Sequence, residues 1–174
     1  YLVDTVELDF DIASDHTRVR ATYSVRRNPD APDASQWRLD GRDMSFVSAA
    51  IDGRALAADE YRLHDDALII ANPPSAFTLT VENTIDPEQN LSLEGFYRSG
   101  DILCTQCEAN GFSRITYFPD RPDVMARYTT RISADAGEFP VLLANGNCVE
   151  QGALDDDRHY AVFEDPYAKP CYLF

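Results

Sequence analysis

Long apolar runs are absent from this chain of 174 residues, although 44% of its residues are hydrophobic. No run reaches the roughly 18 apolar residues that a membrane-spanning helix needs. The chain also shows no basic segment followed by an apolar one, which is the pattern of a secretory leader. The sequence therefore predicts no membrane contact, and its hydrophobic content is that of an ordinary globular protein.

Positive charge is scarce, because 15 Lys and Arg residues stand against 30 Asp and Glu residues, which gives a formal net charge of -15. Phosphates are repelled by such a surface, so we expect no nucleic-acid partner. An attraction for cationic ligands stays open, although acidic runs are usually solvated faces. The run Asp155-Asp156-Asp157 lacks the glycine and the distal glutamate of a calcium loop, and we interpret it as a solvated turn.

Several catalytic motifs are missing as well. His16, His64 and His159 lie far apart, so no pair has the spacing of a His-Glu-x-x-His zinc helix. No Ser-His-Asp triad, phosphate-binding loop or dinucleotide fingerprint can be assembled. The chain by itself is therefore expected to hold no catalytic residue and to bind no metal.

The chain has four cysteines, at positions 104, 107, 148 and 171. Cys104 and Cys107 have the spacing of a metal knuckle or a redox pair, but Cys148 and Cys171 are too far apart to supply a second such pair. We expect four buried free thiols, with a metal or redox site as the alternative. Reduced cysteines are typical of a cytoplasmic protein.

Alternation of apolar and polar residues dominates what is present, and no stretch shows sustained helical periodicity. The first strand runs from Leu2 to Ile12, and its acidic face can meet the basic face of the next strand, residues 18–26, across a hairpin. Further strands are expected around residues 37–39, 44–51, 61–63, 68–70, 77–81, 128–132, 139–143 and 159–163. The sequence predicts one mainly β domain over residues 1–174, an antiparallel sandwich or saddle-like sheet with at most short helical turns.

Breaks between these strands follow turn-forming residues. A loop is expected over residues 28–33, where proline and Asn or Asp interrupt both kinds of ladder. Asn145-Gly146 is the strongest short hairpin signal in the chain. Asp165-Pro166 is expected to end the penultimate strand, and one short helical turn is expected within residues 114–122.

Polar groups gather in Cys104-Thr105-Gln106-Cys107-Glu108-Ala109, where the strand pattern gives way to a turn-rich segment. Gln106 and Glu108 are two apart, so on an extended strand their side chains point the same way. A carboxylate and an amide that project side by side can receive and orient a cation. The structural alternative is that Glu108 caps a turn and Gln106 satisfies backbone groups.

This stretch also carries a resemblance. Thr105-Gln106-x-Glu108-Ala109, with Arg114, Phe118-Pro119-Asp120-Arg121-Pro122 and Ala126-Arg127-Tyr128, resembles the amino-terminal domain of zinc aminopeptidases of the aminopeptidase N family. The bacterial alanyl aminopeptidases share the Gln-Cys-Glu-Ala form. The likeness extends from the opening strand to the final Lys169-Pro170-Cys171-Tyr172-Leu173-Phe174. The combined pattern is specific, whereas Gln-x-Glu alone would carry no weight.

The resemblance implies the substrate-anchoring domain of a broad-specificity zinc aminopeptidase, excised from a larger metallopeptidase that removes amino-terminal residues from peptides. In that family the Glu matching Glu108 binds the free ammonium of the substrate, and the Gln matching Gln106 lines the pocket for the first side chain. The zinc and its His-Glu-x-x-His helix belong to a catalytic domain outside this chain. The expected partners are that domain and a peptide with a free amino terminus, and the chain alone is expected to be inactive.

The same resemblance implies that the peptide bond after Glu108 is cis. Arg114 is expected to pair with Asp120 or Asp123, because they are close in a segment that cannot form regular ladders and because the family has a matching Arg and Asp. Composition and strand pattern alone fit a second function equally well, that of a non-catalytic β-sandwich module that binds protein or carbohydrate.

Overall fold

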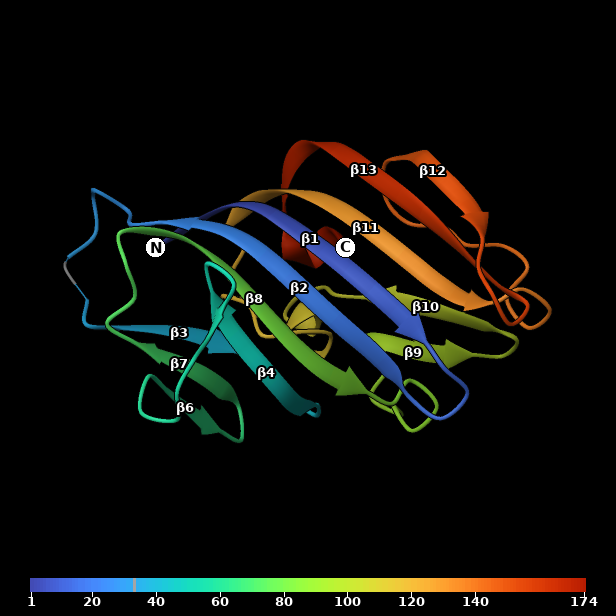
Figure 1. The fold of residues 1–174 in the computed structure, drawn as a ribbon, viewed down its shortest axis with the longest axis horizontal. Helices are drawn as coiled ribbons and strands as arrows, with labels where there is room; N and C mark the ends of the chain where they lie inside the picture. The colour runs from blue at the N-terminus through green and yellow to red at the C-terminus, as the bar shows by residue number, and fades with distance from the viewer. Residues whose placement is uncertain (33) are drawn as a thin grey trace.

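The computed structural model describes residues 1–32 and 34–174 and shows an almost purely β chain (Figure 1). In chain order its strands are β1 (Leu2–Ile12), β2 (Thr17–Arg26), β3 (Gln36–Asp40), β4 (Ser45–Ile51), β5 (Arg54–Ala55), β6 (Tyr61–His64), β7 (Ala67–Ala71), β8 (Ala76–Ile85), β9 (Gly95–Ser99), β10 (Ile102–Gln106), β11 (Met125–Asp135), β12 (Asn147–Ala153) and β13 (Arg158–Pro170). Within the described residues, helical structure is limited to two short 3-10 helices, η1 (Gly111–Arg114) and η2 (Cys171–Leu173). The predicted mainly β fold with short helical turns is confirmed.

Eight strands form one large twisted sheet, in the order β12-β13-β11-β1-β2-β8-β4-β5 (Figure 1). Neighbouring strands run antiparallel, with one exception: β1 and β11 are parallel, and Val6 lies opposite Tyr128. The prediction of an antiparallel sheet is therefore corrected at this pair. Alternating burial is the same in parallel and antiparallel strands that share a core, so the sequence pattern does not reveal strand direction.

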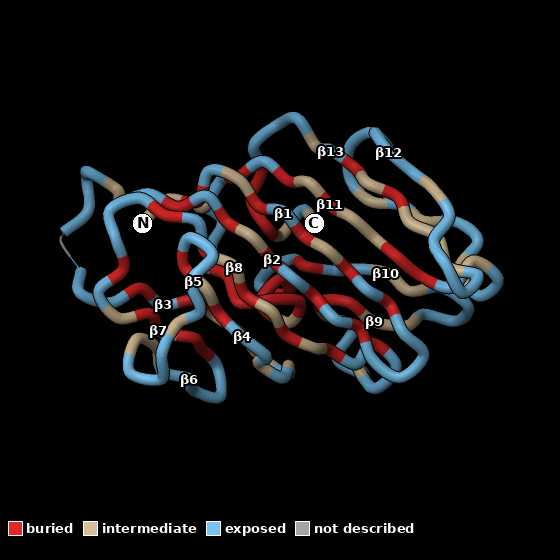
Figure 2. Tube along the Cα trace, viewed as in Figure 1, coloured by how far each residue is buried: buried red, intermediate tan, exposed pale blue. Residues whose placement is uncertain are grey.

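A second layer covers one face of the large sheet. At one end lies the three-stranded sheet β3-β7-β6, and at the other lies the hairpin β9–β10, with η1 between them (Figure 1). The buried residues concentrate between the two layers (Figure 2). Among the fully buried side chains are Val6 and Val81 from the large sheet and Leu39, Ile70 and Phe118 from the opposing layer. The chain is thus a two-layer sandwich whose core lies between unequal sheets.

The outer face of the large sheet is charged, but its ion pairs differ from those predicted. Asp4 pairs with Arg26 across the β1–β2 hairpin, as expected. Asp9 and Asp11 instead pair with Arg131 on β11 and Arg158 on β13. The arginines at positions 18 and 20 of β2 turn to Glu82 on β8. Apart from Glu82, which is 15% exposed, the side chains in these pairs are at least 30% exposed, and each pair contributes about 0.2–1 kcal/mol.

One predicted hairpin turn does not form, and the solvated turn predicted at residues 155–157 is confirmed. Residues 139–144 form no strand, so Asn145-Gly146 closes no hairpin. Gly146 has φ +90°, and a Cβ at this position would lie 2.2 Å from the carbonyl oxygen of Glu164, so only glycine fits where the chain meets β13. The hairpin turn is the acidic run instead, because Asp156 and Asp157 have φ of 59° and 57° between β12 and β13.

Three other expectations concern the ends of elements. Strand β13 continues past Asp165-Pro166 to Pro170, because a register shift opposite Ala126 and Tyr128 accommodates the proline. The helical turn expected within residues 114–122 begins earlier, at Gly111. The loop predicted over residues 28–33 includes Asp33, which lies outside the described residues. Among the described residues, neither helical segment has the length and apolar composition that crossing a bilayer requires.

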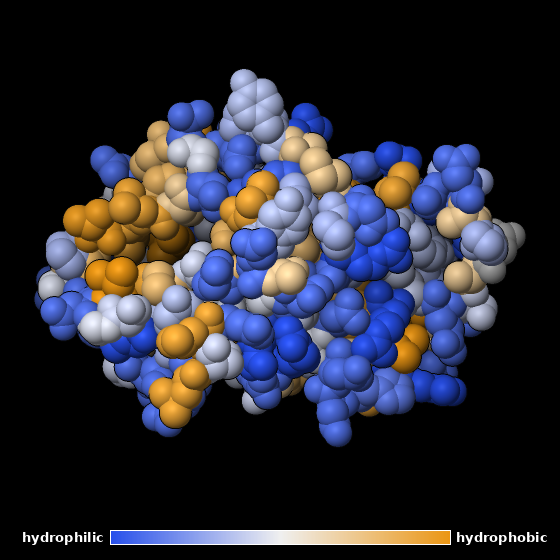
Figure 3. Space-filling view, turned by 180° about the vertical axis from the view of Figure 1, so that it is seen from behind, coloured by the Kyte–Doolittle hydropathy of each residue, from blue (hydrophilic) through white to orange (hydrophobic). Residues whose placement is uncertain are grey.

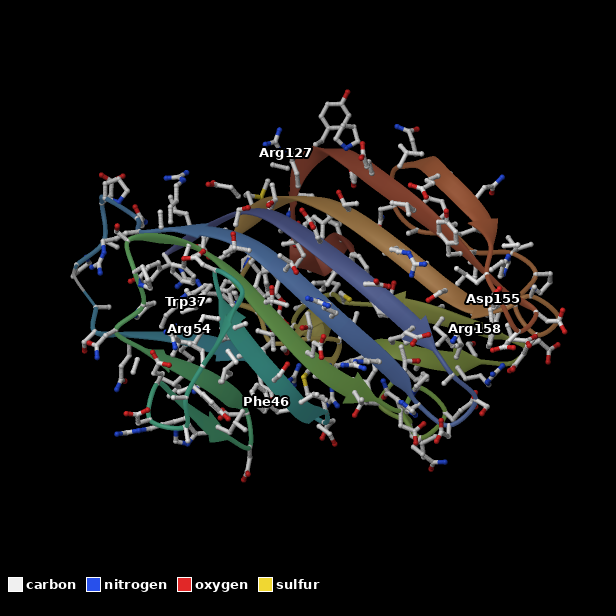
Figure 4. The ribbon with its side chains drawn as sticks, in the orientation of Figure 1. Trp37, Phe46, Arg54, Arg127, Asp155 and Arg158 are labelled. Atoms are coloured by element: carbon white, nitrogen blue, oxygen red, sulfur yellow. The ribbon has the colours of Figure 1, made fainter. Side chains whose placement is uncertain are left out.

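The two ends of the sandwich differ in their side chains. Figure 4 shows Trp37 and Phe46 at the end that carries the three-stranded sheet, and Arg158 beside Asp155 at the opposite end. Trp37 packs against the rings of Tyr1 and Phe77, with ring centroids 5.5 and 5.9 Å apart. The first end is therefore closed by aromatic packing. From the other end, strand β10 runs inward, and the polar stretch singled out in the sequence continues from it toward η1 (Figure 1).

Candidate functional site

The candidate site lies where β10 ends. Strand β10 pairs with β9, so that Gln106, its last residue, lies opposite Gly95. Gly111 follows closely, and a Cβ on it would lie 2.4 Å from the carbonyl oxygen of Gln106 and 2.9 Å from the amide nitrogen of Gly95. Only glycine allows η1 to approach the hairpin this closely. The chain therefore reverses within the few residues that include Glu108.

Gln106 and Glu108 both face solvent, and Cys107 between them is fully buried. The strand ends at Gln106, so Glu108 belongs to the turn at residues 108–110 and not to the strand itself. The peptide bond from Glu108 to Ala109 is cis, which confirms that expectation. The structure thus exposes the amide and the carboxylate two residues apart, as predicted, on a turn that replaces the expected strand.

The side chains of Gln106 and Glu108 are free of partners within the described part of the chain. Among the described residues, the side chains of Gln106 and Glu108 make no hydrogen bond and no ion pair with the protein, and Glu108 caps no turn. The nearby acids are partnered: Glu94 contacts Arg114, and Asp120 is hydrogen-bonded in the core. The contacts that a purely structural role would require are therefore absent from the part of the chain that the structure describes.

Asp120 anchors the segment from below. It is buried, and its carboxylate accepts hydrogen bonds from the Ser113 backbone N–H at 2.8 Å and the Cys171 thiol at 3.1 Å. The Asn110 side-chain amide donates to the Asp120 carbonyl oxygen at 3.1 Å. Arg42 donates to the Asn110 carbonyl oxygen at 2.6 Å from the other side. The turn that bears Glu108 is thus held by hydrogen bonds at Asn110, its last residue, and by the buried Asp120 beneath it.

Aromatic packing completes this support. Phe112 of η1 is fully buried, and its ring lies 5.1 Å from Phe118, 6.1 Å from Tyr128 and 5.4 Å from Phe174, centroid to centroid. These are the edge-to-face arrangements that aromatic rings prefer. Tyr23 adds a hydrogen bond from its hydroxyl to the carbonyl oxygen of Tyr117 at 2.9 Å. A rigid base of this kind holds an exposed side chain in one place.

Arg114 has other partners than those predicted. Its guanidinium contacts Asp43 and, at 3.2 Å, the Glu94 carboxylate, while Asp120 and Asp123 are engaged elsewhere. Asp123 pairs with Arg121. The prediction was wrong because it relied on proximity in sequence, whereas η1 packs against the beginning of β9 and brings Glu94 close. Asp43, Glu94 and Arg42 were missed, since no local pattern links their distant segments to residues 107–120.

The four cysteines differ in burial, which corrects the expectation that all are buried. Cys107 and Cys171 are buried, Cys104 is half-buried, and Cys148 on β12 is exposed. Burial, and to a smaller extent the Asp120 carboxylate, raises the pKa of Cys107. Lys169 lowers it, and the net result is a pKa of about 12. Burial also raises the pKa of Cys171. Both thiols are therefore protonated near neutral pH, whereas metal ligation and nucleophilic attack need the thiolate.

No metal centre can be built from the described residues, because no three His, Cys, Asp or Glu side chains lie where they could share an ion. Positions 104 and 107 supply at most two of the four ligands that a closed zinc site needs, and no third candidate ligand among the described residues lies within reach. The alternative of a metal knuckle at these two positions has no support in the geometry.

Comparison with known proteins bears on what this site does. The Peptidase M1 N-terminal domain family matches residues 4–173. The chain belongs to this family. An aminopeptidase N of Caulobacter vibrioides is 52% identical over 174 residues, and one of Escherichia coli is 47% identical over 176 residues. Each match covers 100% of this chain and 20% of the relative, so the chain spans about a fifth of the length of the curated relatives that it matches.

Solved structures agree with this M1 assignment. Aminopeptidase A of Legionella pneumophila, in complex with aspartic acid, shares 33% identity and a TM-score of 0.94 over 99% of this chain and 20% of its own. An M1 zinc metallopeptidase of Deinococcus radiodurans superposes with a TM-score of 0.81 over 98% of this chain and 40% of its own, at 17% identity, which shows the shared fold alone. The resemblance to the amino-terminal domain of the aminopeptidase N family is confirmed, and the catalytic domain lies outside this M1 chain.

Proposed function

We propose that this chain is the substrate-anchoring amino-terminal domain of a broad-specificity zinc aminopeptidase. Glu108 binds the free ammonium of a peptide, and Gln106 lines the pocket for its first side chain. One observation carries the proposal: an amide and a carboxylate, exposed two residues apart, have no partner among the described residues and rest on a rigid base. Side chains that are held in place but make no contacts with the described part of the protein are suited to binding a ligand.

The charge of Glu108 supplies selection for a free amino terminus. A hydrogen bond to a charged group contributes about 1.5–3 kcal/mol. That range corresponds to about one to two decades of discrimination against blocked or internal peptides. An ammonium fixed by Glu108 also sets the register of the peptide, so that its first peptide bond lies at one distance from the anchor.

Zinc enters this proposal only through the parent enzyme, in which it would supply the hydrolytic chemistry. The described residues of this chain provide no site for it, so we assign the ion and the catalytic residues to the domain outside this chain. Residues 1–174 alone are expected to bind no stoichiometric zinc and to hydrolyse no aminoacyl amide. The further assignments are a single domain over residues 1–174, a cytoplasmic location supported by its four free thiols, and no membrane or nucleic-acid partner.

The test is a kinetic comparison in the complete enzyme. Glu108→Ala should lower kcat/KM for peptides with a free amino terminus by about 10- to 100-fold, through both KM and kcat, because attraction and register are lost together. Glu108→Gln keeps the shape and should be milder. Gln106→Ala should change the preference among first residues with a smaller overall loss.

The matched control is Glu7→Ala, which removes another exposed carboxylate, on β1 and away from the site. It should leave kcat/KM unchanged. Amino-acetylated substrates, which have no ammonium, should be insensitive to Glu108→Ala. Unchanged kinetics of Glu108→Ala with free peptides would reduce the residue to a structural role and remove the proposal.

A further inference from the structure

Residues 140–145, here called the strap, run between β11 and β12 without joining a sheet. Residues 141–144 are an unbroken apolar run, and their burial alternates as in a half-buried strand: Leu142 and Ala144 are partly buried, while Val141 and Leu143 are 70% and 76% exposed. A segment with the side-chain pattern of a strand therefore has no neighbouring strand within the described residues.

The backbone of the strap lacks partners too. Among the described residues, the N–H groups of residues 141–144 donate no hydrogen bond to any protein atom. The segment is held at its ends, where the Phe139 N–H donates to the Asp135 carbonyl oxygen at 2.9 Å and the Asn145 side chain donates to the Leu173 carbonyl oxygen at 3.3 Å. Covering the strap requires hydrogen-bonding groups as well as apolar ones, because buried backbone N–H groups need acceptors.

An apolar cleft opens beneath the strap. Its volume is about 130 Å³, and it is lined mostly by apolar side chains that include Phe10, Ile132, Leu142 and Phe174. Seen from behind, hydrophobic atoms gather around a hollow at the end of the molecule that carries β9 and β10 (Figure 3). The exposed side chains of Val141 and Leu143 also line the cleft, so it reaches the surface and a partner's side chain can enter it. Exposed apolar patches around such a hollow mark interaction sites.

The cleft lies next to the candidate site. Its wall includes Thr105, the residue before Gln106, and the Thr105 hydroxyl donates to the Phe174 carbonyl oxygen at 3.3 Å. Phe174 in turn packs on Phe112 of η1, just after the turn that bears Glu108. A partner that docks on the strap would therefore lie next to the segment that carries Glu108, because Phe174 lines the cleft and contacts both Thr105 and Phe112.

A second copy of this chain is a poor occupant. The strap and its neighbour Leu173 carry no charge, but the chain as a whole has a net charge of -15, which opposes self-association. The curated relatives are about five times longer than this chain, so a second domain of the same polypeptide is the occupant that proximity favours.

We propose that the strap and its cleft form the docking surface for the zinc-bearing domain of the same enzyme, an inference that rests on the proposed function. That domain inserts apolar side chains into the cleft and offers backbone acceptors to residues 141–144, as the edge of a strand or an extended loop can. Docking at this place brings the end of β10, with Gln106 and Glu108, to the border of the other domain.

Amide hydrogen exchange in the complete enzyme tests this surface. The control is built in: Leu91 and Leu93 are also exposed apolar residues whose N–H groups donate no hydrogen bond among the described residues. After correction for intrinsic rates, residues 141–144 should exchange at least about tenfold more slowly than Leu91 and Leu93. Exchange at the rate of the control loop would show an open strap and overturn the proposal.

Dilution of the enzyme distinguishes docking of a domain of the same polypeptide from docking of a second copy. Protection that persists at concentrations where light scattering gives a monomer supports docking within one polypeptide. Protection that disappears on dilution together with a dimer assigns the surface to a second copy and overturns the proposal.

A pair of variants adds a second readout. Leu143→Asp should lower the apparent Tm of the complete enzyme and raise the exchange of residues 141–144, whereas Leu91→Asp, at an 88% exposed position, should do neither. Equal effects of the two substitutions would contradict the proposal. Because exchange is read on the unmodified enzyme, a strap that is protected while Glu108→Ala keeps full activity would remove the anchoring role and leave the docking surface in place.

Discussion

Residues 107–122 and residues 139–146 both leave the strand pattern, and they differ in how their polar groups are satisfied. In the first segment the backbone is tied to side chains from distant parts of the chain, as in the bond from Asn83 to the Ile115 carbonyl oxygen at 2.9 Å. In the second, the N–H groups of residues 141–144 have no protein partner within the described residues. The first segment buries aromatic rings, and the second exposes aliphatic side chains.

This difference in backbone hydrogen bonding matches the two roles proposed above. A segment that is satisfied internally can leave single side chains, here Gln106 and Glu108, free for a ligand without losing its shape. A segment whose backbone is unpaired obtains its stability from whatever covers it. We therefore expect substitutions in the first segment to act within this chain, and substitutions in the strap to act through a partner.

The largest effect should come from Asp120→Ala, which breaks the anchored segment. The substitution leaves the buried Ser113 N–H without an acceptor and the Cys171 thiol without its partner. We expect a loss of about 3 kcal/mol in the free energy of unfolding. Urea unfolding of the chain, followed by the fluorescence of its single tryptophan, Trp37, measures this loss. Val141→Asp in the same chain should cost far less, and equal losses would erase the contrast between the segments.

A second, smaller effect should appear at alkaline pH. The pKa of Cys107 is raised from its ordinary value of about 9 to about 12, chiefly by burial, with Asp120 raising it and Lys169 lowering it. The folded protein therefore holds this proton more tightly than the unfolded chain, and stability is lost as the pH rises from 9 toward 12. At pH 10 the expected loss is about 1 kcal/mol relative to pH 8.

The Cys107→Ala variant isolates that contribution. Urea unfolding at both pH values should show a smaller drop for the variant than for the unmodified chain. Cys171 and Tyr128, whose pKa values are also raised, are present in both proteins. Because Cys107 adds a minor part of their shifts, the variant loses that part together with the titration of Cys107 itself. An identical drop in the two proteins would contradict burial as the cause at Cys107.

The smallest effect should come from Arg114→Ala. Its partners Asp43 and Glu94 are largely open to solvent, with side chains 70% and 45% exposed, so no buried carboxylate is left alone. The expected loss is about 0.5–1 kcal/mol, and raising the salt concentration should shrink it. A salt-independent loss of several kcal/mol would mean that Arg114 anchors the segment as strongly as Asp120 does.

Local sequence specified much of the fold and the candidate site residues. The alternation of Leu2–Ile12 predicted β1 because inward and outward positions repeat every two residues. The positions of Gln106 and Glu108, on either side of an inward-facing Cys107, followed from the same rule, and the extended motif around them identified the family. These features depend on neighbours within a few residues, so the sequence expresses them directly.

Tertiary structure alone decided which distant segments meet. The parallel pairing of β1 with β11, the choice of Glu94 over Asp120 by Arg114, and the exposure of Cys148 on a sheet edge all depend on segments far apart in the chain. Asn145-Gly146 has the residues of a hairpin turn but meets the backbone of Glu164 instead, while the turn forms at Asp156 and Asp157. Turn residues permit a reversal, but the partner strand is selected by burial and hydrogen bonding across the whole sheet, which no local pattern contains.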